Sequence, residues 1–305
     1  MTDREKREKI QRAVHKDREG WLRAQRREIA ALGALYLRYG RAVKLDIIDA
    51  ANSDGLLVGV SAPALERAVS RKIALLAADR NDLFDWAVRA SATNGAARIA
   101  PVARIAGAEM PAATIAHAES RMASWLERHV AEDGLNLSAR LWRIDLGAQD
   151  KIISALRDGI RQGEAIDKTF KELLRGGAPD AATTRKIERA FGQSRAVNVG
   201  ENIQKLFTRR GEKNIVFNVE RVLITETNRV NGHAFIESSR DAGAIGMRWC
   251  LSPSHPRADI CDDYATADKY GLGPGGYPMD AIPAFPAHPL CLCYLVPIFP
   301  WEVRK

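Results

Sequence analysis

The sequence has no long hydrophobic run, no cysteine before residue 250 and no signal-like N-terminus. No apolar stretch approaches the roughly 20 residues that a membrane-spanning helix requires. Residues 1–9 are dense in alternating charges and contain no apolar segment of the kind found in secretory signals. These absences predict a chain with no membrane partner that is made and kept in a cytoplasm.

Positive charge is scarce near the C-terminus and abundant upstream. The net charge is +8, yet between Cys250 and Lys305 six acidic residues outnumber four basic ones. The surplus therefore lies elsewhere, and includes residues 4–27 and 185–229. A basic surface can bind DNA phosphates through counterion release. Because glutamates are interspersed among these bases, the pattern favours the simpler interpretation, in which they form solvated helix faces.

Hydrophobic periodicity predicts a mostly α protein with a C-terminal α+β module. Helices are expected at residues 21–49, 61–89, 112–131, 150–175, 179–209 and 218–242. Residues 91–111 are rich in alanine and glycine, which predicts a loop or short helices. Proline, glycine and aromatic residues then become frequent, and short strands are expected at 247–251 and 292–298. We expect a long helical N-terminal region over residues 1–149 and a compact module over residues 150–305.

Two further local patterns lead to predictions. The helix expected at 150–175 carries one apolar stripe, formed by Ile152, Leu156, Ile160, Ile166, Phe170 and Leu173. The glycine-rich segment 271–276 superficially suggests a phosphate-binding loop. Because no Lys-Ser/Thr pair follows it and it opens no helix, we predict a flexible loop instead.

Three polar residues and a valine share one face of the helix expected at 218–242. Glu226, Arg229, Val230 and His233 follow one another at helical spacing. One interpretation makes Glu226 a general base, or a metal ligand together with His233. The other is an ion pair between Glu226 and Arg229 that anchors the helix against the C-terminal module. The absence of a nearby nucleophile favours the ion pair.

All four cysteines fall in the last fifth of the chain, and histidines accompany them. In a cytosolic protein such a cluster predicts a metal site before it predicts disulfides. A tetrahedral zinc site needs four nitrogen or sulfur ligands, best supplied as two short-range pairs. One set is His288, Cys291 and Cys293. The other, about 30 residues upstream, is Cys261 with His255 or Asp259.

Two alternatives to a zinc site stay open at this point. The thiols could be reduced and simply buried, or they could form a disulfide after leaving the cell. Cys250 stands beside Trp249 and is expected to be a core residue, because a free cysteine behaves as a small hydrophobe.

Taken in order, these signals resemble the C-terminal domain of phage Mu F-like minor head proteins. That family typically shows a Gly-x-x-x-Gly-like helix and an R-x-x-x-T-E-x-x-R-x-N-like helix. A tryptophan follows, before an Asp/Cys segment, and then a closing H-P-x-C-x-C with a later proline. The matching residues are Gly159, Gly163, Arg221, Thr225, Glu226, Arg229, Asn231, Trp249, Asp259, Cys261, His288, Pro289, Cys291, Cys293 and Pro297. The resemblance covers about half of the chain, from near Asp150 onward. Many relatives carry Cys-x-x-Cys where this chain has a single cysteine followed by aspartates, which puts the ligand set in doubt.

The resemblance implies a low-copy structural protein of the phage head, assembled in the host cytoplasm, and not an enzyme. Its expected partners are the portal protein, the major capsid or scaffolding protein, and phage DNA. The basic N-terminal half would lie against the portal or the packaged DNA. Two other functions remain as alternatives. One is a metal-dependent nuclease or hydrolase that uses Glu226, His255 and Asp259, and the other is a basic DNA-binding protein.

Overall fold

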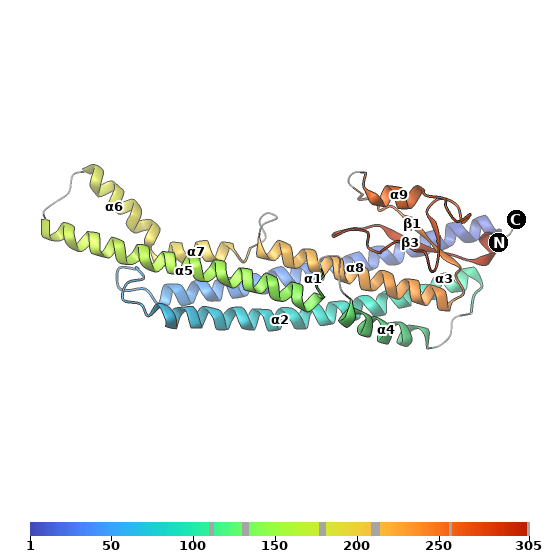
Figure 1. The fold of residues 1–305 in the computed structure, drawn as a ribbon, viewed down its shortest axis with the longest axis horizontal. Helices are drawn as coiled ribbons and strands as arrows, with labels where there is room; N and C mark the ends of the chain where they lie inside the picture. The colour runs from blue at the N-terminus through green and yellow to red at the C-terminus, as the bar shows by residue number, and fades with distance from the viewer. Residues whose placement is uncertain (110–112, 130–133, 177–180, 209–213, 256–257, 304–305) are drawn as a thin grey trace. The chain divides into compact units, whose positions relative to one another are not determined.

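The computed structural model describes residues 1–109, 113–129, 134–176, 181–208, 214–255 and 258–303. It is mostly helical with a small three-stranded antiparallel sheet near the C-terminus, which confirms the predicted fold class. Figure 1 labels the elements. The helices are α1 (Asp3–Asp49), α2 (Ala62–Ala97), α3 (Ile99–Ala106), α4 (Thr114–Arg128), α5 (Leu137–Gly176), α6 (Ala181–Ser194), α7 (Ala196–Lys205), α8 (Ile215–Asp241) and α9 (Ile260–Thr266). The strands are β1 (Gly246–Cys250), β2 (Gly276–Pro278) and β3 (Tyr294–Ile298), and a 3₁₀ turn spans Pro300–Glu302.

The chain divides into two compact units, and each is made of separate segments. Unit 1 comprises residues 1–29, 83–138 and 220–305, and unit 2 comprises residues 30–82 and 139–219. Each unit therefore combines residues from before and after position 150. Neither coincides with the expected regions 1–149 and 150–305.

Unit 2 is built from helices whose apolar residues recur at helical spacing. On α5, Ile152, Leu156 and Ile160 are buried, as the stripe predicts. Ile166 is half-buried, and the side chains of Phe170 and Leu173 lie outside the described residues. A buried Arg80 guanidinium forms a bidentate ion pair with Asp145 across this unit. The carboxylate compensates the charge of the guanidinium, which would be costly to bury alone.

Glycines on α5 mark close packing inside unit 2. A Cβ added at Gly159 would lie 2.7 Å from a methyl group of Val199 on α7. One added at Gly163 would lie 3.3 Å from the backbone of Leu57. These glycines allow neighbouring backbone to approach closely, which explains the Gly-x-x-x-Gly element without a ligand.

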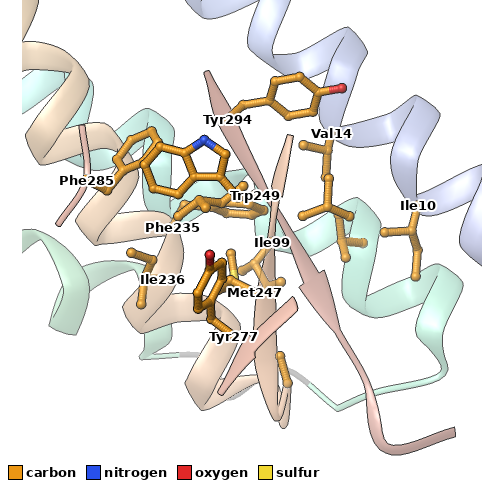
Figure 2. Close-up of a cluster of buried hydrophobic side chains, with 14 of the residues drawn as sticks. Ile10, Val14, Ile99, Phe235, Ile236, Met247, Trp249, Tyr277, Phe285 and Tyr294 are labelled. Carbon is orange, nitrogen blue, oxygen red and sulfur yellow. The ribbon is translucent and has the colours of Figure 1, made fainter. Parts of the chain in front are cut away.

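Unit 1 contains the sheet, with β1 in the centre of the order β2-β1-β3. Both pairings are antiparallel, and the register places Trp249 of β1 opposite Leu295 of β3. Figure 2 shows the core beneath it, where Trp249 and Phe285 meet Phe235 of α8. Ile10 and Val14, from the first turns of α1, belong to the same core. The N-terminal segment is therefore part of the fold of the C-terminal module.

Several helices are longer than periodicity predicts. α1 begins at Asp3 and not near residue 21, because Ile10 and Val14 are buried in unit 1. α2 continues to Ala97 and the short helix α3 follows, so the segment 91–111, expected to be a loop or short helices, is largely helical in its described part. Tertiary packing explains the extension of α2, since Ala92 and Ala96 are buried against α8. The expected helix ends near residues 112, 131, 179 and 209 lie outside the described residues.

The predicted strands are present, and a third one was missed. β1 and β3 match the expected positions within one or two residues. β2 begins at Gly276, at the end of the segment predicted to be a flexible loop, and pairs with β1. A Cβ at Gly276 would come within 2.6 Å of Leu272, so this glycine serves a tight turn into the strand.

Within the described ranges, no helix is both long enough and apolar enough to cross a bilayer.

Candidate metal centre

The first residues of the site stand at the start of α9. Asp259 is the N-cap, and its carboxylate accepts a hydrogen bond of 2.7 Å from the backbone N–H of Cys261. Asp262 reaches back to accept a bond of 2.8 Å from the backbone N–H of Asp259. This capping box satisfies the free N–H groups of the helix end and fixes the orientation of the first turn. Cys261 is thereby held with its side chain buried.

The second part of the site is the loop 288–293, which α8 and α1 hold in place. Thr225 accepts a hydrogen bond from the backbone N–H of Leu290 at 3.3 Å, and Asn228 donates one to the carbonyl of Cys291 at 2.6 Å. The guanidinium of Arg18 donates to the carbonyl of Leu292 and to the hydroxyl of Ser252. Leu290 adopts a left-handed φ of 62°, a conformation that costs a non-glycine residue roughly 1–2 kcal/mol. These bonds stabilise the loop against that cost.

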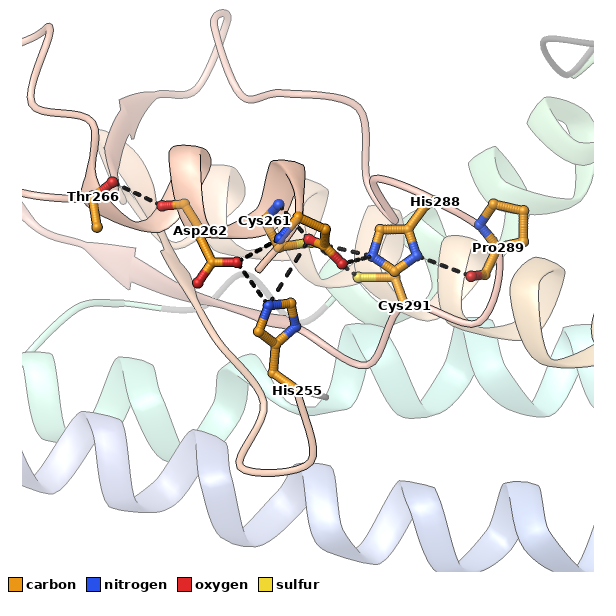
Figure 3. A network of polar contacts seen from close by, with 8 residues as sticks. His255, Cys261, Asp262, Thr266, His288, Pro289 and Cys291 are labelled. Atoms are coloured by element: carbon orange, nitrogen blue, oxygen red, sulfur yellow. Dashed lines mark hydrogen bonds and ion pairs between the residues drawn. The ribbon is translucent and has the colours of Figure 1, made fainter. Parts of the chain in front are cut away.

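Three donor atoms meet where these two parts converge (Figure 3). The Sγ of Cys261 lies 3.6 Å from the Sγ of Cys291 and 3.5 Å from the Nε2 of His288. The other ring nitrogen of His288 lies 2.9 Å from the carbonyl oxygen of Pro289. A carbonyl only accepts, so Nδ1 carries a proton, and Nε2 is the nitrogen that faces the sulfurs. These three side chains could hold a metal ion.

A second group of donors lies beside the first. His255, Asp259 and Asp262 bring one nitrogen and two carboxylate oxygens together, with 2.8 Å between His255 and Asp262. The hydrogen bond to Asp262 raises the pKa of His255 above its ordinary value. Asp259 joins the two groups, because its Oδ2 lies 3.1 Å from the Nε2 of His288. The hydrogen bond from the Cys261 backbone lowers the pKa of Asp259.

When no metal ion is nearby, burial keeps the thiols of Cys261 and Cys250 protonated. It raises the pKa of Cys261 to about 12 and that of Cys250 to about 11. The neighbouring Cys291 thiol and burial raise the pKa of Cys293 further. A metal ion would have to displace these protons, since the thiolate is the ligand.

The sequence-predicted ligands are not all in one group. Cys261, His288 and Cys291 come together, whereas His255 belongs to the neighbouring carboxylate group. Cys293 is buried, but it is not a member of the three-donor group.

Trp249, which belongs to the resemblance, and its neighbour Cys250 are core residues. Trp249 is almost fully buried, with edge-to-face contacts to Tyr264 and Phe285. Cys250 is half-buried at the edge of this core. Neither belongs to the described donor groups.

The polar face of α8 is arranged as an ion pair. Arg229 donates to both oxygens of the buried Glu226 at 2.7 and 2.9 Å. The ring of His233 contacts that of Trp125 in a tilted arrangement, with 4.6 Å between ring centroids. Burial, with the Arg229 charge nearby, lowers the pKa of His233 to about 4, so it is neutral at pH 7. Neither Glu226 nor His233 belongs to the described donor groups.

Two residues that hold the loop 288–293 in place were not predicted from the sequence. Asn228 lies within the α8 motif, where its position between Glu226 and Asn231 was the available signal. Arg18 carried no signal, since 274 residues separate it from Leu292. Its contact exists only because α1 packs into the core of unit 1.

Comparison with known proteins adds no relative: no family model, no curated protein and no solved structure matches this chain.

Proposed function

We propose that this chain is a minor head protein of a bacteriophage, an assembly component and not an enzyme, whose C-terminal module is stabilised by a structural zinc ion. The main support for the proposal is that motifs far apart in the sequence contact one another in the structure. Thr225, from the α8 motif, hydrogen-bonds the loop of the closing motif, and that loop brings His288 and Cys291 to Cys261. The α8 motif, the Cys261 segment and the closing motif are therefore joined within unit 1, whereas Gly159 and Gly163 belong to unit 2.

The donor geometry supports zinc in particular. Ligands of a tetrahedral zinc ion, bound at about 2.3 Å through sulfur and about 2.0–2.1 Å through nitrogen, lie roughly 3.5–3.8 Å apart. The distances of 3.6 Å between the two sulfurs and 3.5 Å between sulfur and nitrogen fall in this range. The bond from His288 Nδ1 to a carbonyl is the outer contact that zinc-binding histidines usually make.

Either of two neighbours can supply the fourth ligand. Cys293 is buried two residues after Cys291, and the Oδ2 of Asp259 lies 3.1 Å from the Nε2 of His288. Zinc content measured on purified Cys293→Ser and Asp259→Asn proteins identifies it, because the variant of the true ligand loses affinity for zinc by tenfold or more.

Head assembly is tested by co-expression of this chain with its expected partner, the portal protein. The complex is purified after nuclease treatment, so that DNA cannot bridge the two proteins, and its mass is measured in solution. A complex of defined stoichiometry is the expected result. Soluble, folded chain that never binds the portal, capsid or scaffolding protein would contradict the proposal.

A metal-dependent hydrolase is the second candidate, and the His255–Asp259–Asp262 group is the observation that favours it. A carboxylate and a histidine next to a metal could activate water if one coordination position stays open. Plasmid nicking in the presence of zinc or magnesium tests this function. Nicking that disappears in Asp259→Ala and Glu226→Ala would replace the assembly proposal with an enzymatic one.

A further inference from the structure

The exposed face of α1 between residues 9 and 27 is strongly basic. Eight residues of this stretch are exposed, and six of them carry positive charge: Lys9, Arg12, Lys16, Arg23, Arg26 and Arg27. The other two are Gln11 and Glu19. We call the six bases the α1 basic row.

The row is continuous along one side of the helix. Five of the bases, at positions 9, 12, 16, 23 and 27, follow the three- and four-residue steps that place side chains on one face, with Gly20 in the gap. At about 1.5 Å per residue, they span about 27 Å. The stretch belongs entirely to unit 1, and its opposite face is fixed by the buried Val14, Arg18 and Gln25.

These charges are not used within the described part of the protein. None of the six bases forms an ion pair with a carboxylate there, and Arg12 contacts only the backbone carbonyl of Glu8. The one exposed acid of the stretch, Glu19, lies 3.7 Å from His15. By contrast, exposed bases on α5 pair with carboxylates on their own helix, as Lys171 does with Asp167.

The chemistry of the row fits a polyanion better than a protein or a membrane. Protein interfaces usually have an apolar centre, and membrane-surface helices insert apolar side chains. Among the described residues of unit 1 up to Ile29, only Met1 is an exposed large hydrophobic. Single-stranded nucleic acids are bound through exposed aromatic rings, which this face also lacks.

We propose that the α1 basic row binds the phosphate backbone of duplex DNA without base specificity. Duplex DNA presents one negative charge per about 1.7 Å of its axis, so a straight row of bases can meet successive phosphates along its length. Contacts to the phosphate backbone position a protein on the duplex and carry no sequence information. The inference does not rest on the proposed head function, since it needs only the exposed charges of one helix.

Titration of a fluorescent 30-base-pair duplex with the full chain over a series of salt concentrations tests the proposal. The row variant is Lys16→Gln/Arg23→Gln/Arg27→Gln. The matched control is Arg161→Gln/Lys168→Gln/Lys171→Gln, which removes the same charge from α5, where each base is already paired. All six positions are exposed, so both variants should fold, which thermal melting verifies.

The row variant should bind DNA on the order of 100-fold more weakly at 0.1 M salt, with a log K against log salt slope shallower by about 3. The control should bind as the wild type does. If both variants lost the same amount of affinity for DNA, net charge alone would explain the binding, and the proposal would be overturned. Absence of DNA binding by the wild type, or tighter binding to phosphatidylserine vesicles than to DNA, would also overturn it. Portal binding measured after nuclease treatment is a separate result, so failure here leaves the head proposal standing.

Discussion

Cys291 and Cys250 have different surroundings, although both lie in the C-terminal module. Cys291 belongs to the three-donor group, whereas Cys250 stands at the edge of the core. If the group binds zinc at a free concentration about a thousandfold above Kd, the ion stabilises the folded state by about 4 kcal/mol. Cys291→Ser should lose most of that stability together with the bound metal.

Metal analysis and thermal melting check this prediction. Cys250→Ser is the matched control, and it should keep its zinc and melt near the wild type. Wild-type protein that is purified without zinc, and whose melting temperature does not respond to a chelator, would exclude a structural metal.

Glu28 is a buried carboxylate on α1, with one oxygen that has no hydrogen-bond partner among the described residues. Burial raises its pKa from 4.5 to about 7. Between these values the folded state holds a proton that the unfolded state releases, so stability is lost as the pH rises through this window. Glu28→Gln stays neutral, and should gain stability over the wild type as the pH rises from 4.5 to 7.

The gain has an upper bound on the order of 3 kcal/mol at neutral pH, and should vanish below pH 4.5. Urea unfolding at a series of pH values measures it. Glu19→Gln removes the same charge at an exposed position and should show no comparable gain. A Glu28→Gln protein that is no more stable than the wild type at pH 7.5 would contradict the argument.

At the scale of elements, Gly95 decides how α2 packs on α8. A Cβ at this position would overlap the carbonyl oxygen of Asn231 and lie 3.0 Å from Ala234. Asn231 also donates to the carbonyl of Ser91 at 3.1 Å and accepts from the buried Arg98 at 2.8 Å. The backbone of α8 is therefore fixed here. Gly95→Ala should destabilise unit 1 by about 1–3 kcal/mol, despite the better helix propensity of alanine.

Gly147 on α5 provides the control, because a Cβ there meets nothing within 4 Å. Gly147→Ala should stabilise the protein by up to about 1 kcal/mol. Chemical unfolding of the two single variants compares them directly. A gain in stability from Gly95→Ala would mean that α2 does not approach α8 this closely.

At the scale of the whole molecule, the N-terminal segment belongs to the fold of the C-terminal module. Ile10 and Val14 are buried in the core that contains Trp249, Cys261 and Cys291. Arg18 holds the carbonyl of Leu292, between two of the cysteines. Each large core side chain removed costs about 2–5 kcal/mol, so the deletion of residues 1–20, which removes Ile10, Val14 and Arg18, should cost an amount comparable with the stability of a typical domain.

Near-ultraviolet circular dichroism and intrinsic tryptophan fluorescence test this prediction, since Trp249 reports on the core. Deletion of residues 1–5 is the control, because these residues are exposed and contribute nothing to the buried cluster. Residues 150–305 alone should likewise fail to fold, which would make portal binding by such a fragment uninformative. A cooperative unfolding transition in the chain lacking residues 1–20 would contradict the shared core.

The sequence by itself determined the helical class, the approximate positions of β1 and β3, and the clustering of cysteine and histidine. These follow from local chemistry, since periodicity, glycine and proline act over a few residues. The tertiary structure decided what local chemistry cannot. It extended α1 to Asp3, paired Gly276 with β1, separated His255 from the three-donor group, and brought Arg18 to the loop of Cys291. Each of these outcomes depends on contacts between residues far apart in the chain, and no spacing along a single sequence encodes which distant surfaces become buried together.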